Sequence, residues 1–104
     1  MKASRASTLP ELSSWQLGAV NRFARDHERA RHSSFARLEA VDAIKAAKGA
    51  LTPAQAAVLD LAAVRGRTLA QVAAATGRRL ADLQDLMSSA ATRLARHYET
   101  AAQE

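Results

Sequence analysis

Residues 68–87 read TLAQVAAATGRRLADLQDLM, and this stretch decides the fold. Thr68 is a favoured N-cap residue, and the apolar residues that follow it at three- and four-residue steps predict a short helix. The pair Thr76-Gly77 ends that helix, because glycine readily adopts the positive φ of a tight turn. A second apolar pattern starts directly afterwards and predicts a longer helix that continues to about Tyr98. This layout is that of a helix-turn-helix.

The two helices of this motif should share one small core. Helical spacing points Leu69 and Val72 of the first helix toward Leu83 and Met87 of the second. We therefore predict that these four side chains form one buried cluster.

An amphipathic helix is predicted near the start of the chain. Thr8 and Glu11 form a capping-box signal, so we expect a helix that begins near Leu9 and ends near Arg31 or His32. Apolar residues recur within it at helical spacing and would dock on another helix: Leu12, Trp15, Ala19 and Phe23.

The next predicted helix spans Phe35 to Lys48. Ser33 or Ser34 would cap its N-terminus, and Gly49 would close it in the left-handed conformation. Its apolar residues are Phe35, Leu38, Val41 and Ile44.

A third upstream helix completes the set. Thr52 and Gln55 repeat the capping-box signal, and Gly66 ends the helix. We thus expect a small all-α domain of about five helices with a C-terminal helix-turn-helix. Its regions would be an N-terminal helical part (1–50), the helix-turn-helix part (51–98) and a frayed tail (99–104).

Composition narrows the class of protein. Apolar residues make up 48% of the chain but aromatic residues only 4%, which favours closely packed helices. The chain has no cysteine, so neither a disulfide framework nor a thiolate metal site is possible. The N-terminal residues contain no uninterrupted apolar run that would make a signal peptide or a membrane span. We expect a cytoplasmic protein that does not bind a membrane.

The net charge of +5 indicates a polyanionic partner such as nucleic acid. Residues 1–50 hold nine Lys and Arg against five Asp and Glu, for +4, whereas residues 51–104 hold six against five, for +1. Arg22, Arg25, Arg29 and His32 are spaced three or four apart, and we call them the cationic stripe. The stripe would track DNA phosphates; the alternative is an ordinary solvated helix face.

The second half of the chain resembles region 4 of bacterial sigma-70 factors over residues 51–96. The resemblance is carried by Leu51-Thr-Pro53-Ala-Gln55, the pair Val58-Leu59, Gly66, the run 68–73, Gly77, Leu83, Met87, Ala90 and Leu94. Residues 22–30 (RFARDHERA) and 94–98 (LARHY) also look like parts of the sigma-like transcriptional activators of gene transfer agents and prophage regulators. The resemblance implies a promoter-binding activator that works on double-stranded DNA with RNA polymerase.

In the sigma family the exposed face of the last helix contacts bases and phosphates. Here Arg78 and Arg79 would hold phosphates, and Gln84 would read adenine. Asp82 and Asp85 depart from the family pattern, and each costs affinity unless it accepts from a cytosine amino group. The candidate DNA-binding residues are Arg22, Arg25, Arg29, Arg67, Arg78, Arg79, Asp82, Gln84 and Asp85.

Two other functions remain open. In a protein-interaction module, the acidic and apolar face of the last helix would bind RNA polymerase or a regulator, with Trp15, Phe23 and Leu86 as partner-binding residues. In a phage-type small terminase component, the amphipathic first helix would be the contact that joins subunits into a ring. The solution mass separates the ring from a monomeric or dimeric regulator.

Catalysis is not expected. His27 and His32 are five residues apart and do not share a helix face, which argues against a metal site; His97 lies far along the chain. Asp82 and Asp85 lack both a phosphate-binding glycine loop and a paired base. We predict a protein that is not an enzyme and needs no metal or cofactor.

Overall fold

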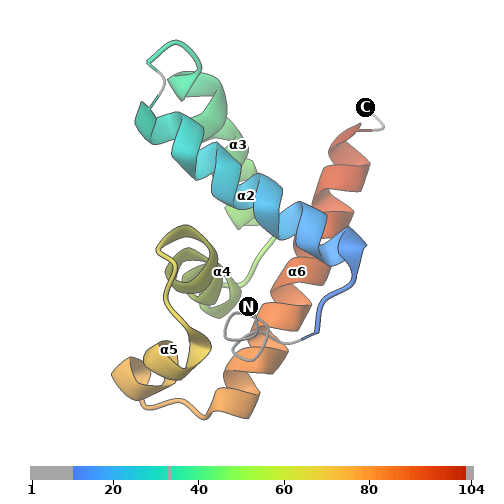
Figure 1. Ribbon diagram of the computed structural model, residues 1–104. Coiled ribbons are helices and arrows are strands. Elements are labelled where there is room, and N and C mark those ends of the chain that lie inside the picture. Colours follow the sequence, from blue (N-terminus) through green and yellow to red (C-terminus); the bar gives the residue numbers. More distant parts are fainter. Residues whose placement is uncertain (1–10, 33, 103–104) are drawn as a thin grey trace.

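The computed structural model describes residues 11–32 and 34–102, and every regular element in these ranges is a helix (Figure 1). In order these are α2 (Ser14–His32), α3 (Arg37–Gly49), α4 (Pro53–Leu59), the π-helical turn η1 (Asp60–Val64), α5 (Leu69–Thr76) and α6 (Leu80–Ala102). The expected small all-α fold with about five helices is confirmed.

Helix α2 starts later than predicted. Residues 11–13 are not helical, and Ser13 makes the capping box of α2; the predicted cap Thr8 lies outside the described residues. The Ser13 backbone N–H donates to Gln16 Oε1 (2.8 Å), and the Gln16 N–H donates to Ser13 Oγ (3.2 Å). The chain therefore carries two start signals, and the second one opens the helix. The predicted end at His32 is confirmed.

Helix α3 differs from the prediction at both ends. It begins at Arg37, and its N-cap residue, Ala36, makes no side-chain capping bond; Ser33 lies outside the described residues. Gly49 is the last helical residue and does not adopt a positive φ, so its predicted left-handed role is wrong. Two predicted apolar positions are exposed: Phe35 fully and Leu38 by 80%.

The start and end signals of the next two helices are confirmed. Thr52 and Thr68 both form complete capping boxes, with Gln55 and Gln71 respectively. Gly66 and Gly77 take φ values of 72° and 74°, which a residue with a side chain rarely adopts. Each glycine thereby turns the chain sharply where a helix ends.

Helix α6 is longer than predicted. It runs four residues beyond Tyr98 to Ala102, so residues 99–102 of the predicted frayed tail are helical. This length matters for the packing of the helices within the chain, because α2 lies across α6 (Figure 1). Trp15 Nε1 donates to Glu99 Oε2 over 3.0 Å, which ties the start of α2 to the last turns of α6.

One core joins the two halves of the chain. Ala19, Val20 and Phe23 of α2 belong to the same buried cluster as the apolar residues of α4, α5 and α6. Gln16 Nε2 donates to Thr92 Oγ1 (3.0 Å), and the buried Gln55 donates through Nε2 to Ser89 Oγ (3.0 Å). Residues 1–50, so far as they are described, therefore pack on the helix-turn-helix. No helix within 11–32 and 34–102 has the length and apolar character needed to cross a bilayer.

Candidate nucleic-acid interface

Helices α5 and α6 are held together as predicted. Leu69, Val72, Leu83 and Met87 are all buried by at least 98% and belong to one cluster. The turn between the helices is closed by a residue that sequence reasoning used only as a breaker: Thr76 Oγ1 donates to the Val72 carbonyl (2.7 Å) and accepts from the Arg78 N–H (3.3 Å). The turn is thus anchored at both sides.

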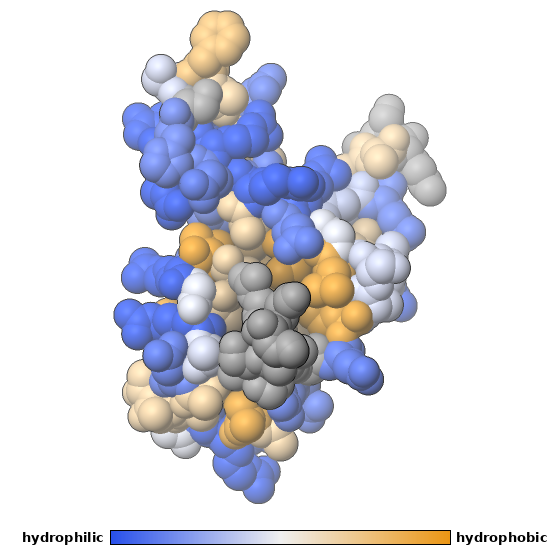
Figure 2. All heavy atoms as spheres, viewed as in Figure 1, coloured by the Kyte–Doolittle hydropathy of each residue, from blue (hydrophilic) through white to orange (hydrophobic). Residues whose placement is uncertain are grey.

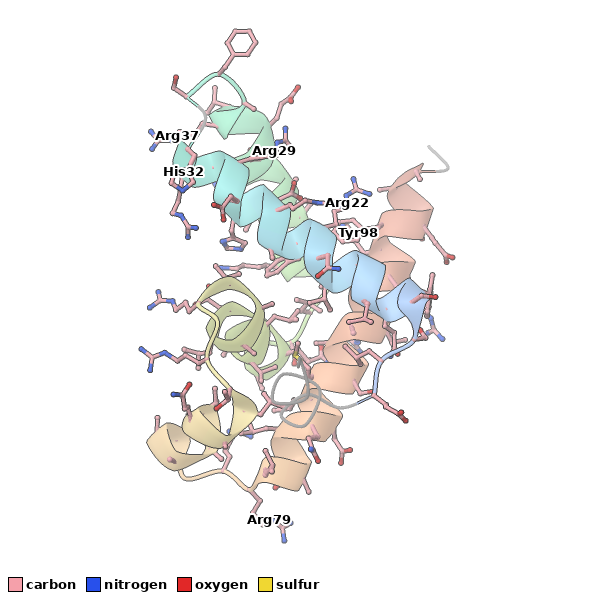
Figure 3. All side chains as sticks on the ribbon, in the orientation of Figure 1. Arg22, Arg29, His32, Arg37, Arg79 and Tyr98 are labelled. Atoms are coloured by element: carbon pink, nitrogen blue, oxygen red, sulfur yellow. The ribbon has the colours of Figure 1, made fainter. Side chains whose placement is uncertain are left out.

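The start of α6 is exposed. We call residues 78–85 the reading segment; within it Arg78, Arg79, Asp82 and Asp85 are exposed, and Gln84 is half-buried. Arg79 Nε lies 3.4 Å from Asp82 Oδ2, so the aspartate partly offsets the charge of its neighbour. Of the five predicted residues in this segment, Asp82, Gln84 and Asp85 lie on the first turns of α6, and Arg78 and Arg79 directly precede the helix. Arg79 lies at the far end of the molecule in Figure 3.

Leu86 does not occupy the outer face assigned to it. Its side chain is half-buried and packs against the core cluster. Leu86 lies three positions after the buried Leu83 and therefore close to the buried stripe of α6, whereas Asp82 and Asp85 are exposed. The predicted partner contact through Leu86 is therefore corrected to a core contact.

Three of the four residues of the cationic stripe contact other side chains of the protein, although all four are exposed. Arg22 stacks its guanidinium over the Tyr98 ring, 4.3 Å from the ring centroid. Arg29 pairs with the buried Asp26 (3.2 Å) and with Glu39 (3.7 Å). Among the described residues Arg22 and Arg25 have no ion pair, and Arg25 has no ring contact either.

The stripe and the reading segment do not form one continuous row. In Figure 3 Arg22, Arg29 and His32 lie in the half of the molecule that is remote from Arg79. Arg67 lies between η1 and α5 and is exposed. Figure 2 shows that hydrophilic side chains cover most of α2 and α3 on the face in view.

The two aromatic residues predicted to bind a partner differ in their exposure. Phe23 is completely buried in the core and is not available to a partner in this fold, which corrects that prediction. Trp15 remains 44% exposed, although its indole N–H is taken by Glu99. The apolar stripe of α2 thus serves the protein's own core, because α6 extends far enough to cover it.

Sequence reasoning missed one group of charged residues. Arg31, Arg37 and Arg65 come from three separate segments and line one pocket together with His27 and His32. Only the fold brings them together, and no spacing in the sequence indicated it. Among the described side chains no group of three or more His, Asp or Glu is arranged to hold a metal ion.

Exposed arginines thus occur in the reading segment, in the cationic stripe and around the pocket. No protein-family model, curated protein or solved structure matches this chain.

Proposed function

We propose that this chain is a DNA-binding regulator of transcription, a sigma-like activator that acts at promoters with RNA polymerase. The DNA-binding part of this proposal rests on the exposed reading segment, which lies at the start of the second helix of the helix-turn-helix. The buried cluster beneath it holds α6 against α5, and Gly77 sets the turn. A rigid helix whose first turn projects from the protein can enter the major groove.

The reading segment divides into two roles. Arg78 and Arg79 precede the first turn of α6, where arginine side chains meet phosphates on either side of the groove. Gln84 would face bases with its half-exposed amide, which can bond adenine at two atoms. Asp82 costs less affinity than an isolated carboxylate, because it is already bonded to Arg79. Promoter binding and the link to RNA polymerase rest on the resemblance to sigma region 4.

A salt titration of DNA binding tests the phosphate role. We expect Arg78→Gln with Arg79→Gln to reduce the log-log salt slope of duplex binding by about 0.9 per lost contact, measured by fluorescence anisotropy. The matched control is Lys45→Gln with Arg96→Gln, which removes two exposed charges outside the reading segment. An equal change of slope in both variants would reject specific phosphate contacts by Arg78 and Arg79.

Base reading is tested at Gln84. Gln84→Ala should cost about 1 to 3 kcal/mol at one base position of the promoter, because an adenine contact is lost there. Asp85→Asn should change sequence preference or tighten nonspecific binding, since it removes a negative charge facing DNA. If the Gln84→Ala variant keeps the DNA affinity and base preference of the wild type, the second candidate function, described next, is favoured.

That second candidate is a protein-interaction module, and it is favoured by the exposed carboxylates Asp82 and Asp85 on the reading segment. The apolar contact once assigned to Leu86 no longer supports it, since that side chain packs inward. In this case both substitutions above leave DNA affinity unchanged, while Asp82→Asn with Asp85→Asn abolishes capture of purified RNA polymerase. The terminase alternative requires α2 as a subunit contact, yet the apolar face of α2 is buried within the chain.

A further inference from the structure

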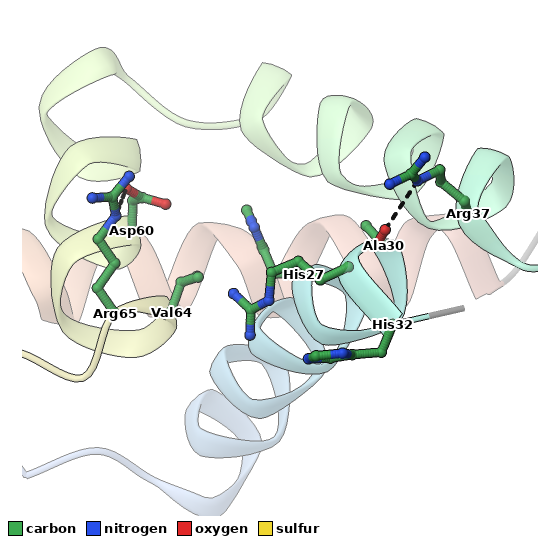
Figure 4. Close-up of a pocket in the computed structure, with 8 residues that line it drawn as sticks. His27, Ala30, His32, Arg37, Asp60, Val64 and Arg65 are labelled. Atoms are coloured by element: carbon green, nitrogen blue, oxygen red, sulfur yellow. Dashed lines mark hydrogen bonds and ion pairs between the residues drawn. The ribbon is translucent and has the colours of Figure 1, made fainter. Parts of the chain in front are cut away.

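A pocket of about 670 Å³ lies between the C-terminal end of α2, the start of α3 and the turn η1. Figure 4 shows His27 between the Asp60–Arg65 pair on one side and Arg37 on the other. The pocket is lined by His27, Ala30, Arg31, His32, Arg37, Asp60, Val64 and Arg65, and we call it the arginine pocket. It contains none of the residues of the reading segment.

Three arginines line this pocket from different elements, and the guanidinium of each keeps free donors. Arg31 pairs through one nitrogen with Glu28 Oε1 (3.2 Å), and Arg65 pairs through Nε with Asp60 Oδ2 (3.2 Å). Arg37 donates through Nε to the Ala30 carbonyl (3.2 Å), as Figure 4 shows. A guanidinium has five N–H donors, so each arginine can still bond an oxyanion.

The charge of the lining matches a phosphate group. Three arginines against Asp60 leave +2 when both histidines are neutral. A phosphate monoester carries about −1.5 to −2 at pH 7. Glu28 stands beside Arg31 and His32, but this carboxylate is exposed and its pairs are of the weak surface kind.

His27 adds a polar atom that lacks a partner. Its Nε2 is buried, and no described group bonds it, while the ring packs edge-on against Phe23 at 4.8 Å. Burial, followed by the charge of Lys48, lowers the pKa of His27, so the ring is neutral near pH 7. Because this nitrogen is buried, it does not itself face the pocket, and another part of the ring lines it.

We propose that the arginine pocket is a binding site for a phosphate group, separate from the DNA-reading surface. Arg31, Arg37 and Arg65 supply charge-assisted donors to the phosphate oxygens, and the ring of His27 lies beside them. Ala30 and Val64 offer apolar contact to whatever carries the phosphate. That carrier is either a small phosphorylated ligand or the backbone of a DNA duplex.

Inorganic pyrophosphate is the probe for the site. In a titration of the full chain followed by NMR, the ring signals of His27 and the side-chain signals of Arg31, Arg37 and Arg65 should shift and saturate together. Calorimetry should show at least about tenfold weaker binding in Arg31→Gln with Arg37→Gln, because two charge-assisted contacts are lost. The control Lys45→Gln with Arg96→Gln, which removes the same charge elsewhere, should bind as the wild type does.

Several results would overturn the site. These are shifts spread evenly over all arginines, equal loss of affinity in the pocket and control variants, or a His27 ring that does not respond. The NMR titration uses the wild-type protein, so it tests the phosphate site even if the double variant does not fold. Arg78→Gln with Arg79→Gln should keep full pyrophosphate affinity, so a failure of this site is distinguishable from a failure of the proposed DNA reading.

A competition experiment identifies the source of the phosphate. If the site takes a small ligand, pyrophosphate binds equally well to the protein on a duplex, and Arg31→Gln with Arg37→Gln leaves duplex affinity unchanged. If the site takes a backbone phosphate, pyrophosphate displaces the duplex beyond the effect of matched ionic strength, and the double variant weakens duplex binding. Either result supports the phosphate site, whereas absence of pyrophosphate binding overturns it.

Discussion

Tyr98 shows how much a single residue contributes at the contact between α2 and α6. Its side chain is buried, and Arg22 stacks on the ring from α2. The hydroxyl has no hydrogen-bond partner among the described residues. A buried hydroxyl without a partner loses its water hydrogen bonds on folding and gains none in return. The ring therefore stabilises the fold while the hydroxyl does not.

We predict that Tyr98→Phe leaves the free energy of unfolding unchanged or raises it by up to about 1 kcal/mol, because the ring stays and the unpaired hydroxyl goes. Tyr98→Ala, which also removes the ring, should cost about 3 kcal/mol or more. Chemical denaturation followed by circular dichroism measures both. A large loss in Tyr98→Phe would mean that the hydroxyl is bonded in solution.

The same residue predicts a response to alkaline pH. Burial, with the nearby Asp26, raises the pKa of Tyr98 to about 12 from its usual 10.0. The folded state thus holds the phenol proton more tightly than the unfolded chain does. The associated stability is present below pH 10 and is lost as pH rises from 10 toward 12. Tyr98→Phe should lose less stability than the wild type over that interval.

At the scale of elements, the fold depends on the pair α5 and α6. Their shared core contains Leu69, Val72, Leu83 and Met87, and α5 has only eight residues. A helix this short is not stable alone in water, so packing against α6 has to maintain it. The position of the reading segment depends on the same contact.

We predict that Leu83→Ala costs about 2 to 5 kcal/mol in the free energy of unfolding, because its side chain is 98% buried and leaves a cavity. Leu80→Ala is the matched control: Leu80 lies on the same helix but is 41% exposed, so its loss should be markedly smaller. Thermal melts followed by circular dichroism measure both. Equal melting temperatures for Leu83→Ala and the wild type would reject the assigned helix pair.

The whole molecule is organised around α6, which receives α5 and α4 on its first half and α2 on its second half (Figure 1). Phe23 is fully buried in this assembly, and Trp15 and Gln16 bond residues of α6. The core of the helix-turn-helix part is therefore incomplete without α2. The N-terminal helices complete its core.

We predict that the fragment 51–104 melts more than about 10 °C below the full chain and binds a hydrophobic dye, because removing α2 exposes part of the core. Phe23→Ala in the full chain is the companion variant and should cost about 3 to 5 kcal/mol. Differential scanning calorimetry and dye fluorescence measure these effects. A fragment as stable as the full chain would show that α2 is an accessory to the fold.

The start and end signals on either side of α4 and α5 were predictable, since they depend on a few neighbouring residues. Thr52 and Thr68 cap their helices, and Gly66 and Gly77 end them in the left-handed conformation. The start of α2 was not predicted, because the capping box of Ser13 and Gln16 lies only a few residues after the similar signal of Thr8 and Glu11. Gly49 shows a further limit, because a glycine can also be the last residue of an ordinary helix.

Side-chain environments followed from the sequence only where one helix pair decided them. The cluster around Leu83 was predictable from helical spacing, and so was the exposure of Arg78 and Arg79 beside the turn. The environments of Phe23 and Leu86 were not, because they depend on which face of α6 is covered by helices far away in the chain.

By itself, the sequence determined the all-helical class, the order of the helices and the turn that exposes the start of α6, because capping, glycine conformation and apolar spacing act over a few residues. Tertiary structure alone decided that α2 covers the second half of α6. It also decided that Arg22 contacts Tyr98 and that Arg29 pairs with Asp26 and Glu39. Finally, it decided that Arg31, Arg37 and Arg65 share one pocket. These contacts join residues that are distant in the chain, and their formation depends on how the helices cross rather than on any local pattern.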